Sequence, residues 1–497
     1  MKLNDILACV ETRLRAGPED VEITGVACDS RQVRPGSLFV AVPGIAQDGR
    51  GFIGDAVAKG AVAVVAESAV ELQAAVCRVV VGDARRALGL LAKAFWHDAA
   101  DTLQLVGVTG TNGKTTVAYL VRDILEQAGR APGLISTVQY RIGPRAIPAS
   151  RTTPDAPTLH RMFSEMVATG CRSAVMEVSS HGLDQQRVAG IAFDAAVFTN
   201  LTRDHLDYHK TMEDYFRAKA RLFEDLGCGT KPAVASINLD DSWGQRLAGM
   251  LGKSAPAGKG ATLLTYAIAA SADVMAEDLR LTSHGARFRL ATPWGATAVE
   301  TSLLGRFNVS NALAAAATGV ALGVGVEAVA AALGKAQAVP GRLQQVATER
   351  GFQVFIDYAH TDDALQRVLE TVREVTSGRL VLVFGCGGNR DSTKRPVMGA
   401  VAARLADHTV VTSDNPRKEE PGAIIAQILE GAPQARNLEP VVDRREAIAH
   451  ALALARPGDV VVVAGKGHET FQEFGSRTLP FDDAQVVREI LLAMGRT

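Results

Sequence analysis

The sequence has few cysteines, almost no net charge and no long run of bulky apolar residues. Its 497 residues include six cysteines, none with the short paired spacing of a zinc or disulfide motif. We therefore expect reduced thiols in a cytoplasmic protein. The formal net charge is -1, which gives no electrostatic reason to expect nucleic acid or an anionic membrane as a partner.

We also expect neither a targeting segment nor a membrane-spanning segment. The N-terminal stretch carries Asp5 and Glu11 and has neither a long apolar core nor a small-residue cleavage site, so it does not read as a signal peptide. The uncharged stretch 309–326 is rich in Ala and Gly and contains Asn311 and Thr318. It lacks the bulky apolar side chains that favour membrane insertion, so we expect a close-packed internal helix and no membrane span.

The chain alternates short apolar runs with amphipathic segments. Residues 103–108 predict a buried strand, and the apolar residues from Val117 to Leu125 recur at i, i+3, i+4, i+7 and i+8, on one face of a helix. This order is typical of a parallel sheet covered by helices. Further strands are expected at 38–44, 61–68, 173–180, 195–201, 354–357, 380–384, 410–412 and 460–464. Residues 220–226 are expected to end a helical stretch, and further helices are expected at 362–375, 393–406 and 422–430. The length and pattern predict three α/β domains, at 1–98, 99–337 and 338–497.

The most informative motif is GVTGTNGKTT at 107–116, a Gly-rich turn between the strand and the helix. Glycines let backbone N–H groups approach a phosphate, and the helix N-terminus adds partial positive charge. In this reading Lys114 reaches the β- and γ-phosphates, and the Thr115 hydroxyl binds Mg²⁺. The nucleotide-binding residues are predicted to be Gly110, Thr111, Asn112, Gly113, Lys114, Thr115 and Thr116.

Five further motifs follow this loop along the chain: MEVSSHGL at 176–183, FTNLTRDHLDYH at 198–209, GRFNVSN at 305–311, DYAHT at 357–361 and AGKGHE at 464–469. With the loop they resemble the Mur ligase family over nearly the whole chain. Three more motifs resemble the branch that adds the third residue of the peptidoglycan stem peptide: DSRQVRPGSLFVAVPG at 29–44, FGCGGNRD at 384–391 and SDNPR at 413–417.

The resemblance implies an N-terminal α/β domain that binds UDP, a central P-loop ATPase domain with a parallel sheet, and a C-terminal Rossmann-like domain that brings the amino acid. It implies a monomer that uses ATP to phosphorylate the D-glutamate carboxylate of UDP-N-acetylmuramoyl-L-alanyl-D-glutamate. The amine of meso-diaminopimelate then attacks the acyl phosphate, because a free carboxylate is a poor acyl donor.

The resemblance also implies a magnesium site made by Thr115, Glu177, His205 and Lys219. A lone histidine is usually structural and imidazole is not a typical Mg²⁺ ligand, so His205 depends on the resemblance alone. Lys219 would pass as a surface lysine, but the family carries a carbamylated lysine at this place. Carbamylation needs a neutral amine, and therefore a lysine whose pKa is lowered by burial or nearby cations.

Three further residues match family positions near ATP, namely Asn308, Arg342 and Asp357. Arg342 is suited to stabilise charge on the γ-phosphate, and we expect Lys114, Lys219, His205 and Arg342 to be catalytic. Two departures from the family pattern, Gln344 and Asp362, are expected to alter contacts made on domain closure. For the UDP-muramyl substrate the resemblance implies Cys28, Ser30, Ile45, Ala46, Gln47, Thr152, Thr153, Ser179, Gln185 and Arg187.

The amino acid is predicted from the turn Asp414-Asn415-Pro416-Arg417, which matches the diaminopimelate motif of the family; Arg390, Gly465 and Glu469 match the rest of that site. Only diaminopimelate has a second carboxylate at its far end, and an arginine fork can bind it at two points. Without the resemblance to the family, the sequence of this turn would predict only a surface loop.

Other functions remain as alternatives. FGCGGNRD could belong to a dinucleotide-binding oxidoreductase, but it lacks the G-x-G-x-x-G pattern and leaves the phosphate loop unexplained. A non-catalytic nucleotide-binding regulator would not need Lys114, Glu177, His205 and Lys219 together. A motor or helicase is disfavoured by the neutral charge, and folylpolyglutamate synthetase by the words at 29–44 and 413–417.

Overall fold

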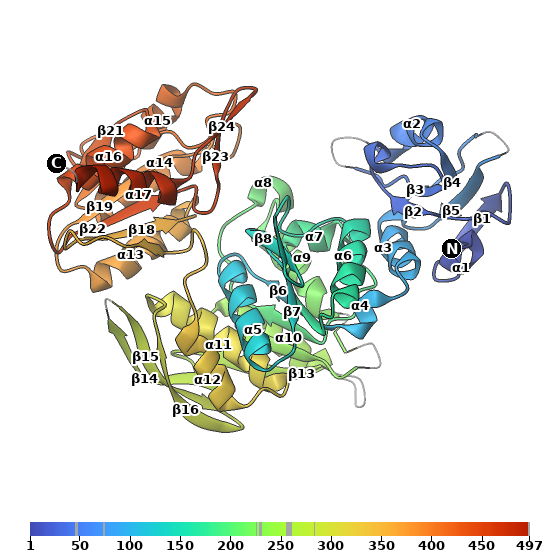
Figure 1. Ribbon diagram of the computed structural model, residues 1–497, viewed down its shortest axis with the longest axis horizontal. Helices are drawn as coiled ribbons and strands as arrows, with labels where there is room; N and C mark the ends of the chain where they lie inside the picture. Colours follow the sequence, from blue (N-terminus) through green and yellow to red (C-terminus); the bar gives the residue numbers. More distant parts are fainter. Residues whose placement is uncertain are drawn as a thin grey trace.

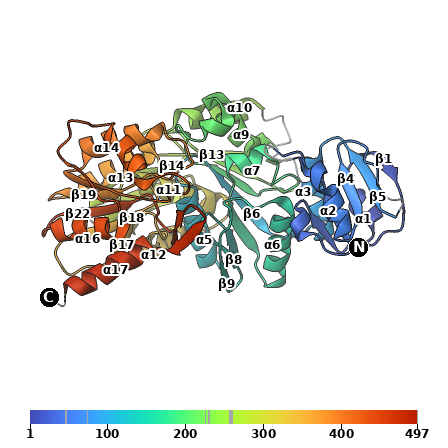
Figure 2. The same cartoon turned by 90° about the horizontal axis from the view of Figure 1, so that it is seen from above.

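The computed structural model describes residues 1–44, 48–72, 75–224, 226–227, 231–254, 261–282 and 284–495. Three α/β lobes lie in a row, with the central lobe between the other two (Figures 1 and 2). Each lobe is built on its own sheet. The described cysteines are free thiols, as expected, and Cys228 lies outside the described residues.

The N-terminal lobe holds a sheet in the order β1-β5-β4-β3-β2. Its strands are β1 (Thr12–Ala16), β2 (Gly25–Ala27), β3 (Ser37–Val40), β4 (Ala61–Ala66) and β5 (Cys77–Val81). The short helices α1 (Leu3–Leu7) and α2 (Ile53–Ala58) and the longer α3 (Ala84–Phe95) accompany it. Asp83 caps α3 by accepting a hydrogen bond from the Arg86 amide, which fixes where the helix begins. The sheet is parallel except at its β1 edge.

The central lobe carries a sheet in the order β16-β15-β14-β13-β12-β11-β6-β10-β7-β8-β9. Its inner strands are β6 (Gln104–Thr109), β7 (Pro132–Ile135), β10 (Ser173–Glu177), β11 (Ala195–Phe198), β12 (Val234–Asn238) and β13 (Thr262–Ala267). Its outer strands are β8 (Gln139–Ile142), β9 (Arg145–Pro148), β14 (Val274–Thr282), β15 (Gly285–Thr292) and β16 (Gly295–Thr301).

This sheet is parallel from β7 to β14 and antiparallel at both edges, so the fully parallel sheet expected from the sequence describes only its interior. The physical reason is burial. β10 is buried at every residue, whereas β15 alternates buried and exposed residues, as a strand with one solvated face does.

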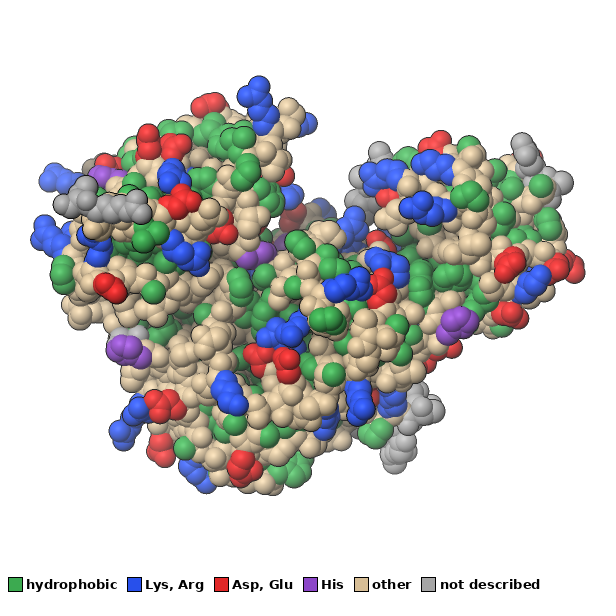
Figure 3. Space-filling view, viewed as in Figure 1, with side chains coloured by type: hydrophobic (Ala, Val, Ile, Leu, Met, Phe, Trp, Pro, Cys, Tyr) green, Lys and Arg blue, Asp and Glu red, His purple; other side chains and the backbone are tan. Residues whose placement is uncertain are grey.

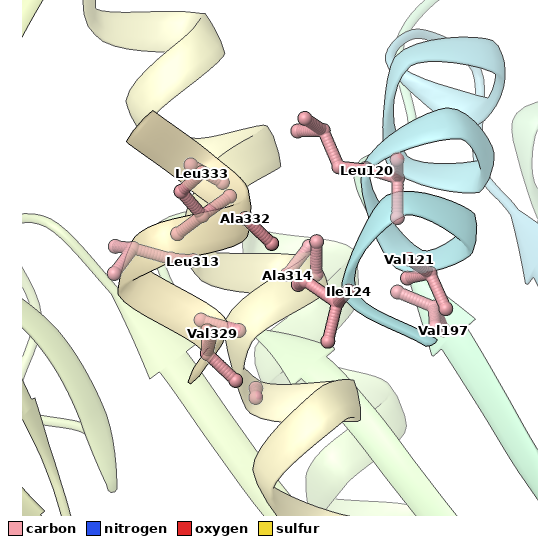
Figure 4. Packing of buried hydrophobic residues seen from close by; sticks show 14 of the residues in the cluster. Leu120, Val121, Ile124, Val197, Leu313, Ala314, Val329, Ala332 and Leu333 are labelled. Atoms are coloured by element: carbon pink, nitrogen blue, oxygen red, sulfur yellow. The ribbon is translucent and has the colours of Figure 1, made fainter. Parts of the chain in front are cut away.

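Helices α5 (Lys114–Gln127), α11 (Arg306–Ala321) and α12 (Val326–Lys335) pack together on this sheet. Figure 4 shows Leu120 and Ile124 of α5 facing Ala314 of α11 and Ala332 of α12. The alanines of α11 let the helices approach closely, so residues 309–321 of the uncharged stretch lie in an internal helix, which ends before residue 326. Among the described residues no helix is long and apolar enough to cross a bilayer.

The remaining central helices are α4 (Ala99–Thr102), α6 (Ala156–Ala168), α7 (Ser180–Asp184), α8 (Leu206–His209), α9 (Met212–Glu224) and α10 (Ser242–Ser254). The C-terminal lobe has a sheet in the order β17-β18-β22-β19-β20-β21 and a hairpin of β23 (Phe471–Phe474) and β24 (Arg477–Pro480). The sheet strands are β17 (Gln344–Val346), β18 (Gln353–Asp357), β19 (Leu380–Phe384), β20 (His408–Val411), β21 (Leu438–Pro440) and β22 (Val460–Ala464). Its helices are α13 (Asp362–Val375), α14 (Lys394–Leu405), α15 (Pro421–Leu429), α16 (Arg444–Leu454) and α17 (Asp483–Met494).

Every strand and helix predicted from the sequence has a counterpart here, and α13 has the predicted bounds. The sequence pattern missed β1, β2, β5, β7 to β9, β12 to β17, β21 and the hairpin β23–β24. The domain boundaries at residues 98 and 337 stay predictions.

Candidate functional site

A cavity of about 610 Å³ lies where the central and C-terminal lobes meet. Above the central lobe the surface is hollowed between the two outer lobes (Figure 3). The cavity is lined by thirteen of the residues predicted from the sequence: Thr111, Asn112, Gly113, Lys114, Thr115, Thr116, Thr152, Glu177, Ser179, His205, Lys219, Arg342 and Asp357. The fold therefore brings residues from both lobes to one space.

The phosphate-binding loop crosses between β6 and the start of α5. Gly110 and Gly113 both have positive φ values, 145° and 86°, which side chains rarely adopt. A Cβ on Gly110 would clash with the Thr199 hydroxyl, and one on Gly113 would clash with the Asn311 amide. The loop therefore needs glycine at both points, and its tight turn leaves the N-terminus of α5 open to the cavity.

Two lysines share one carbonyl oxygen beneath this loop. Lys219 donates to the Gly110 oxygen at 2.7 Å, and Lys114 donates to the same oxygen at 3.0 Å and to the Thr111 oxygen at 2.9 Å. Lys219 is 1% exposed. Burial lowers its pKa well below the usual value, and the charge of Lys114 lowers it further. Burial also lowers the pKa of Lys114.

Oxygen ligands suited to a hard cation lie on the same side of the cavity. Glu177, fully buried at the end of β10, accepts hydrogen bonds from the Thr137 amide at 2.7 Å and hydroxyl at 3.0 Å. The Thr115 hydroxyl is also buried against the cavity, 3.5 Å from the Arg342 guanidinium. A carboxylate and a hydroxyl are the ligand types Mg²⁺ takes, so these two residues fit it. Lys219 as an ammonium does not, because it has no lone pair to offer.

His205 lies at the cavity rim beside Asp204. Its Nε2 is 3.5 Å from the Asp204 carboxylate, and its ring meets the His181 ring edge-on, with the ring centres 4.9 Å apart. Burial lowers the pKa of His205 to about 4, so the imidazole is neutral near pH 7. Its backbone has a φ of 54°, which turns the chain sharply into α8.

Of the three residues predicted near ATP, Arg342 and Asp357 line the cavity, whereas Asn308 lies behind Asn311. Asn308 does not line the cavity; its side-chain oxygen accepts from Asn311, whose own side chain abuts Gly113 and does line it. Asp357 accepts from the backbone amide of the residue after Arg342 at 2.7 Å and so fixes that turn. Arg342 stacks over the Tyr358 ring, with 4.6 Å to its centre.

The residues predicted to bind the UDP-muramyl substrate form a chain of contacts toward Glu177. The Thr153 hydroxyl donates to the Ser179 hydroxyl at 3.1 Å and to the Glu177 backbone oxygen at 3.0 Å. Arg187 donates to the Thr153 backbone oxygen at 2.6 Å and to the Gln185 side chain at 2.7 Å.

The N-terminal members of that set lie farther along. Burial raises the pKa of Cys28 to about 12, aided by the nearby carboxylates of Asp155 and Asp29, so this thiol stays protonated. Ser30 is buried and its backbone oxygen accepts from Lys59. Thr152 accepts from the Thr137 hydroxyl at 3.1 Å. The predicted residues Ile45, Ala46 and Gln47 lie outside the described residues.

The residues predicted to bind the amino acid gather in the C-terminal lobe. Asn415 donates to Glu469 at 2.8 Å, and a Cβ on Gly465 would press on the Asp414 carboxylate. The Arg417 Nε lies 2.7 Å from the Glu473 carboxylate on β23, and its Nη1 donates to the Gly388 oxygen at 2.9 Å. Arg390 is exposed, and Gly387 lies close to the side chains of both Arg390 and Arg417. Pro416 continues the turn.

The two departures from the family pattern both make contacts. Asp362 at the start of α13 pairs with Arg203 of the central lobe at 2.8 Å. The next residue, Asp363, accepts from Asn112 of the phosphate loop at 3.0 Å. Gln344 accepts from the Gly341 amide at 2.9 Å within its own lobe. Asp362 therefore joins the two lobes in this structure, and its effect on domain closure stays a prediction.

Sequence reasoning did not select several residues that the structure brings to these sites. Lys466 is fully buried and lies 3.2 Å from Glu469 and 3.7 Å from Asp414. Asn311 and Tyr358 line the cavity. All three stand inside words quoted from the sequence, GRFNVSN, DYAHT and AGKGHE. Their position within those motifs could have marked them as candidate site residues.

Comparison with known proteins adds independent findings. Three family descriptions match the chain: "Mur ligase family, catalytic domain" at residues 22–96, "Mur ligase middle domain" at 108–319 and "Mur ligase, glutamate ligase domain" at 341–467. Among curated proteins, the chain is similar to two named UDP-N-acetylmuramoyl-L-alanyl-D-glutamate--2,6-diaminopimelate ligase. The Geobacter metallireducens protein is 45% identical, with 98% of each chain covered. The Bacillus velezensis protein is 44% identical, with 100% of each covered.

A solved structure of a protein with the same printed name is 35% identical, covers 100% of both chains and superposes with a TM-score of 0.72. A folylpolyglutamate synthase from Mycobacterium tuberculosis, solved with ADP and AMPPCP, covers 80% of this chain at 19% identity and a TM-score of 0.63. At that identity the second likeness concerns the fold alone.

Proposed function

Because this chain belongs to the Mur ligase family and is an ATP-dependent ligase, we propose that it joins meso-diaminopimelate to UDP-N-acetylmuramoyl-L-alanyl-D-glutamate. The reaction is the one for which its relatives are named. The observation that carries the proposal is a pair of lysines, the half-buried Lys114 and the buried Lys219, beneath a glycine loop that opens onto a cavity between two lobes. Phosphoryl transfer depends on this kind of positioning and charge neutralisation.

ATP would lie with its phosphates over the N-terminus of α5. Lys114 and Arg342 approach from two lobes and neutralise charge on the transferring phosphoryl group. Thr115 and Glu177 would hold Mg²⁺, which supplies further charge neutralisation to the phosphate oxygens. His205 lies at the cavity rim, and its lowered pKa keeps the imidazole neutral near pH 7.

Lys219 has the properties that carbamylation requires. Its amine is buried and its pKa is lowered, so more of it is neutral at a given pH than in a free lysine. Attack of the neutral amine on CO2, with release of one proton to solvent, would give an anionic carbamate with oxygen atoms suited to a hard cation. We propose that Lys219 is carbamylated.

The polar chain from Arg187 through Thr153 and Ser179 would hold the UDP-muramyl dipeptide with its carboxylate toward the phosphate loop. Asp414, Asn415, Arg417 and Glu469 would orient meso-diaminopimelate, with Arg417 on its far carboxylate. Tyr358 lies between the two sites, stacked on Arg342 on one side and near His468 on the other.

A three-substrate assay tests this function. Phosphate release from ATP should require the UDP-dipeptide and meso-diaminopimelate together, with one tripeptide product formed per phosphate. ATP hydrolysis that proceeds equally without either acceptor would contradict a ligase of this specificity.

A further inference from the structure

Three potential metal ligands converge at the edge of the C-terminal sheet, apart from the cavity described above. His408 begins β20, Glu439 lies on the neighbouring edge strand β21, and His450 lies on α16. The Glu439 Oε2 atom is 3.2 Å from the His408 Nε2 and 2.9 Å from the His450 Nε2. One ligand atom from each residue lies within 4.8 Å of the other two.

The hydrogen bonding of this cluster is incomplete. The Nε2 of His408 is buried and forms no hydrogen bond among the described residues, although the Glu439 carboxylate is close. Two imidazole nitrogens therefore point at one carboxylate oxygen, and only His450 is hydrogen-bonded to it. A cation seated between the three atoms would satisfy the buried nitrogen and the carboxylate together.

We propose that His408, Glu439 and His450 form a binding site for a divalent transition-metal ion of the zinc class. Two imidazoles and one carboxylate are typical zinc ligands, whereas Mg²⁺ prefers an all-oxygen set. Neighbouring ligands around tetrahedral zinc are about 3.4 Å apart, given bonds of about 2.0–2.1 Å. The two nitrogen–oxygen distances here are close to that spacing.

The site lies at the opposite end of β20 from the amino-acid cluster. His408 is the first residue of the strand, whereas Asp414 follows its other end. Among the described residues, β21 is the last strand of its sheet and pairs only with β20. The ion would therefore fasten the edge strand and α16 to the interior of the sheet, and would stabilise the fold without taking part in ligation.

Zinc binding to the full-length, chelator-treated protein tests the proposal. Isothermal titration calorimetry with Zn²⁺, without substrates and in buffer containing Mg²⁺, should show one more bound zinc for the wild type than for His450→Ala or Glu439→Gln. Added Zn²⁺ should raise the melting temperature of the wild type more than that of either variant. His97→Ala, which removes an exposed histidine of the N-terminal lobe, is the matched control and should bind as the wild type does.

Both variants change partly exposed side chains, so their melting temperatures without zinc should stay near that of the wild type. The histidines near the cavity could bind zinc as well, but that binding would be equal in the wild type and the variants. Equal zinc stoichiometry and affinity in the wild type, His450→Ala and Glu439→Gln would overturn the proposal. So would the absence of any zinc binding by the wild type.

Discussion

The phosphate-binding loop and the turn at 414–417 hold their buried cations in opposite ways. Within the described structure, Lys114 and Lys219 donate to backbone carbonyls and form no ion pair. At the amino-acid site of the C-terminal lobe, two cations have carboxylate partners: Arg417 has Glu473, and Lys466 has Glu469.

This difference has a physical consequence. A buried cation without a counter-ion is destabilised, and an arriving anion removes that penalty. The phosphate loop is therefore preorganised for a polyanion such as ATP. Arg417 instead has to share or exchange a protein carboxylate when a substrate carboxylate arrives, so we expect it to contribute more to selection than to affinity.

Removing a cation from the unpaired cluster should have the largest effect. Lys114→Ala should lower kcat by about 10³-fold, because an electrostatic donor to the transferring phosphate is lost. Its melting temperature should stay the same or rise, since a desolvated charge is removed. Phosphate release measures kcat, and thermal unfolding measures the melting temperature. Lys335→Ala, at the end of α12, is the control; near-normal turnover in Lys114→Ala would remove the loop from the mechanism.

Lys219→Ala should lower kcat by about 10²-fold or more if a carbamate holds the metal. Acetate or formate should restore part of the activity by supplying oxygen atoms, whereas bicarbonate should not. A carbamate carbon should appear in NMR spectra of the wild type incubated with ¹³C-bicarbonate and be missing in the variant.

The same signal should weaken as pH falls, because protonation of the Lys219 amine removes the form that reacts. Since burial lowers this pKa, the signal should persist at pH values where free lysine is almost wholly protonated. A wild type with full activity and no carbamate signal would contradict the modification.

In the paired cluster, Arg417→Ala should raise the KM for meso-diaminopimelate about 10- to 100-fold, corresponding to about 1.5–3 kcal/mol for a charged hydrogen bond. The KM for ATP should change little, because the two clusters are separate. Arg417→Lys keeps the charge but loses the two-point geometry, so it should recover only part of the loss. An unchanged KM in Arg417→Ala would show that another residue binds the far carboxylate.

The smallest effect is expected at the partner of Arg417. Glu473→Gln removes the competing charge and should lower the KM for meso-diaminopimelate about two- to five-fold, as suits a partly exposed ion pair. Glu489→Gln, whose partner is the exposed Arg445, is the matched control. A rise in KM as large as that of Arg417→Ala would mean that Glu473 positions the arginine and does not compete for it.

The two clusters also differ in how far the sequence predicted them. GVTGTNGKTT could be interpreted physically, because glycines, a lysine and a threonine between a strand and a helix have few other uses. The burial of Lys219 could not be read from its helix, where its neighbours Arg217 and Arg221 are charged and exposed. Only the resemblance selected it.

The sequence pattern predicted fewer contacts at the amino-acid site. Lys466 and Glu473 come from segments far along the chain from Asp414, and nothing local predicts that these charges meet. Strands β14 and β16 were missed for another reason: their burial alternates only weakly, and no helical segment separates them from β15. Long-range pairing of this kind is decided by tertiary packing.

The specificity for the amino acid tests the account most directly. The measurement is kcat/KM for meso-diaminopimelate and for L-lysine, with saturating ATP and UDP-dipeptide, in the wild-type enzyme. We predict a preference of at least about 10²-fold for meso-diaminopimelate, because L-lysine leaves the Arg417 fork without the carboxylate it is placed to bind. Equal values for the two amino acids would contradict the assignment.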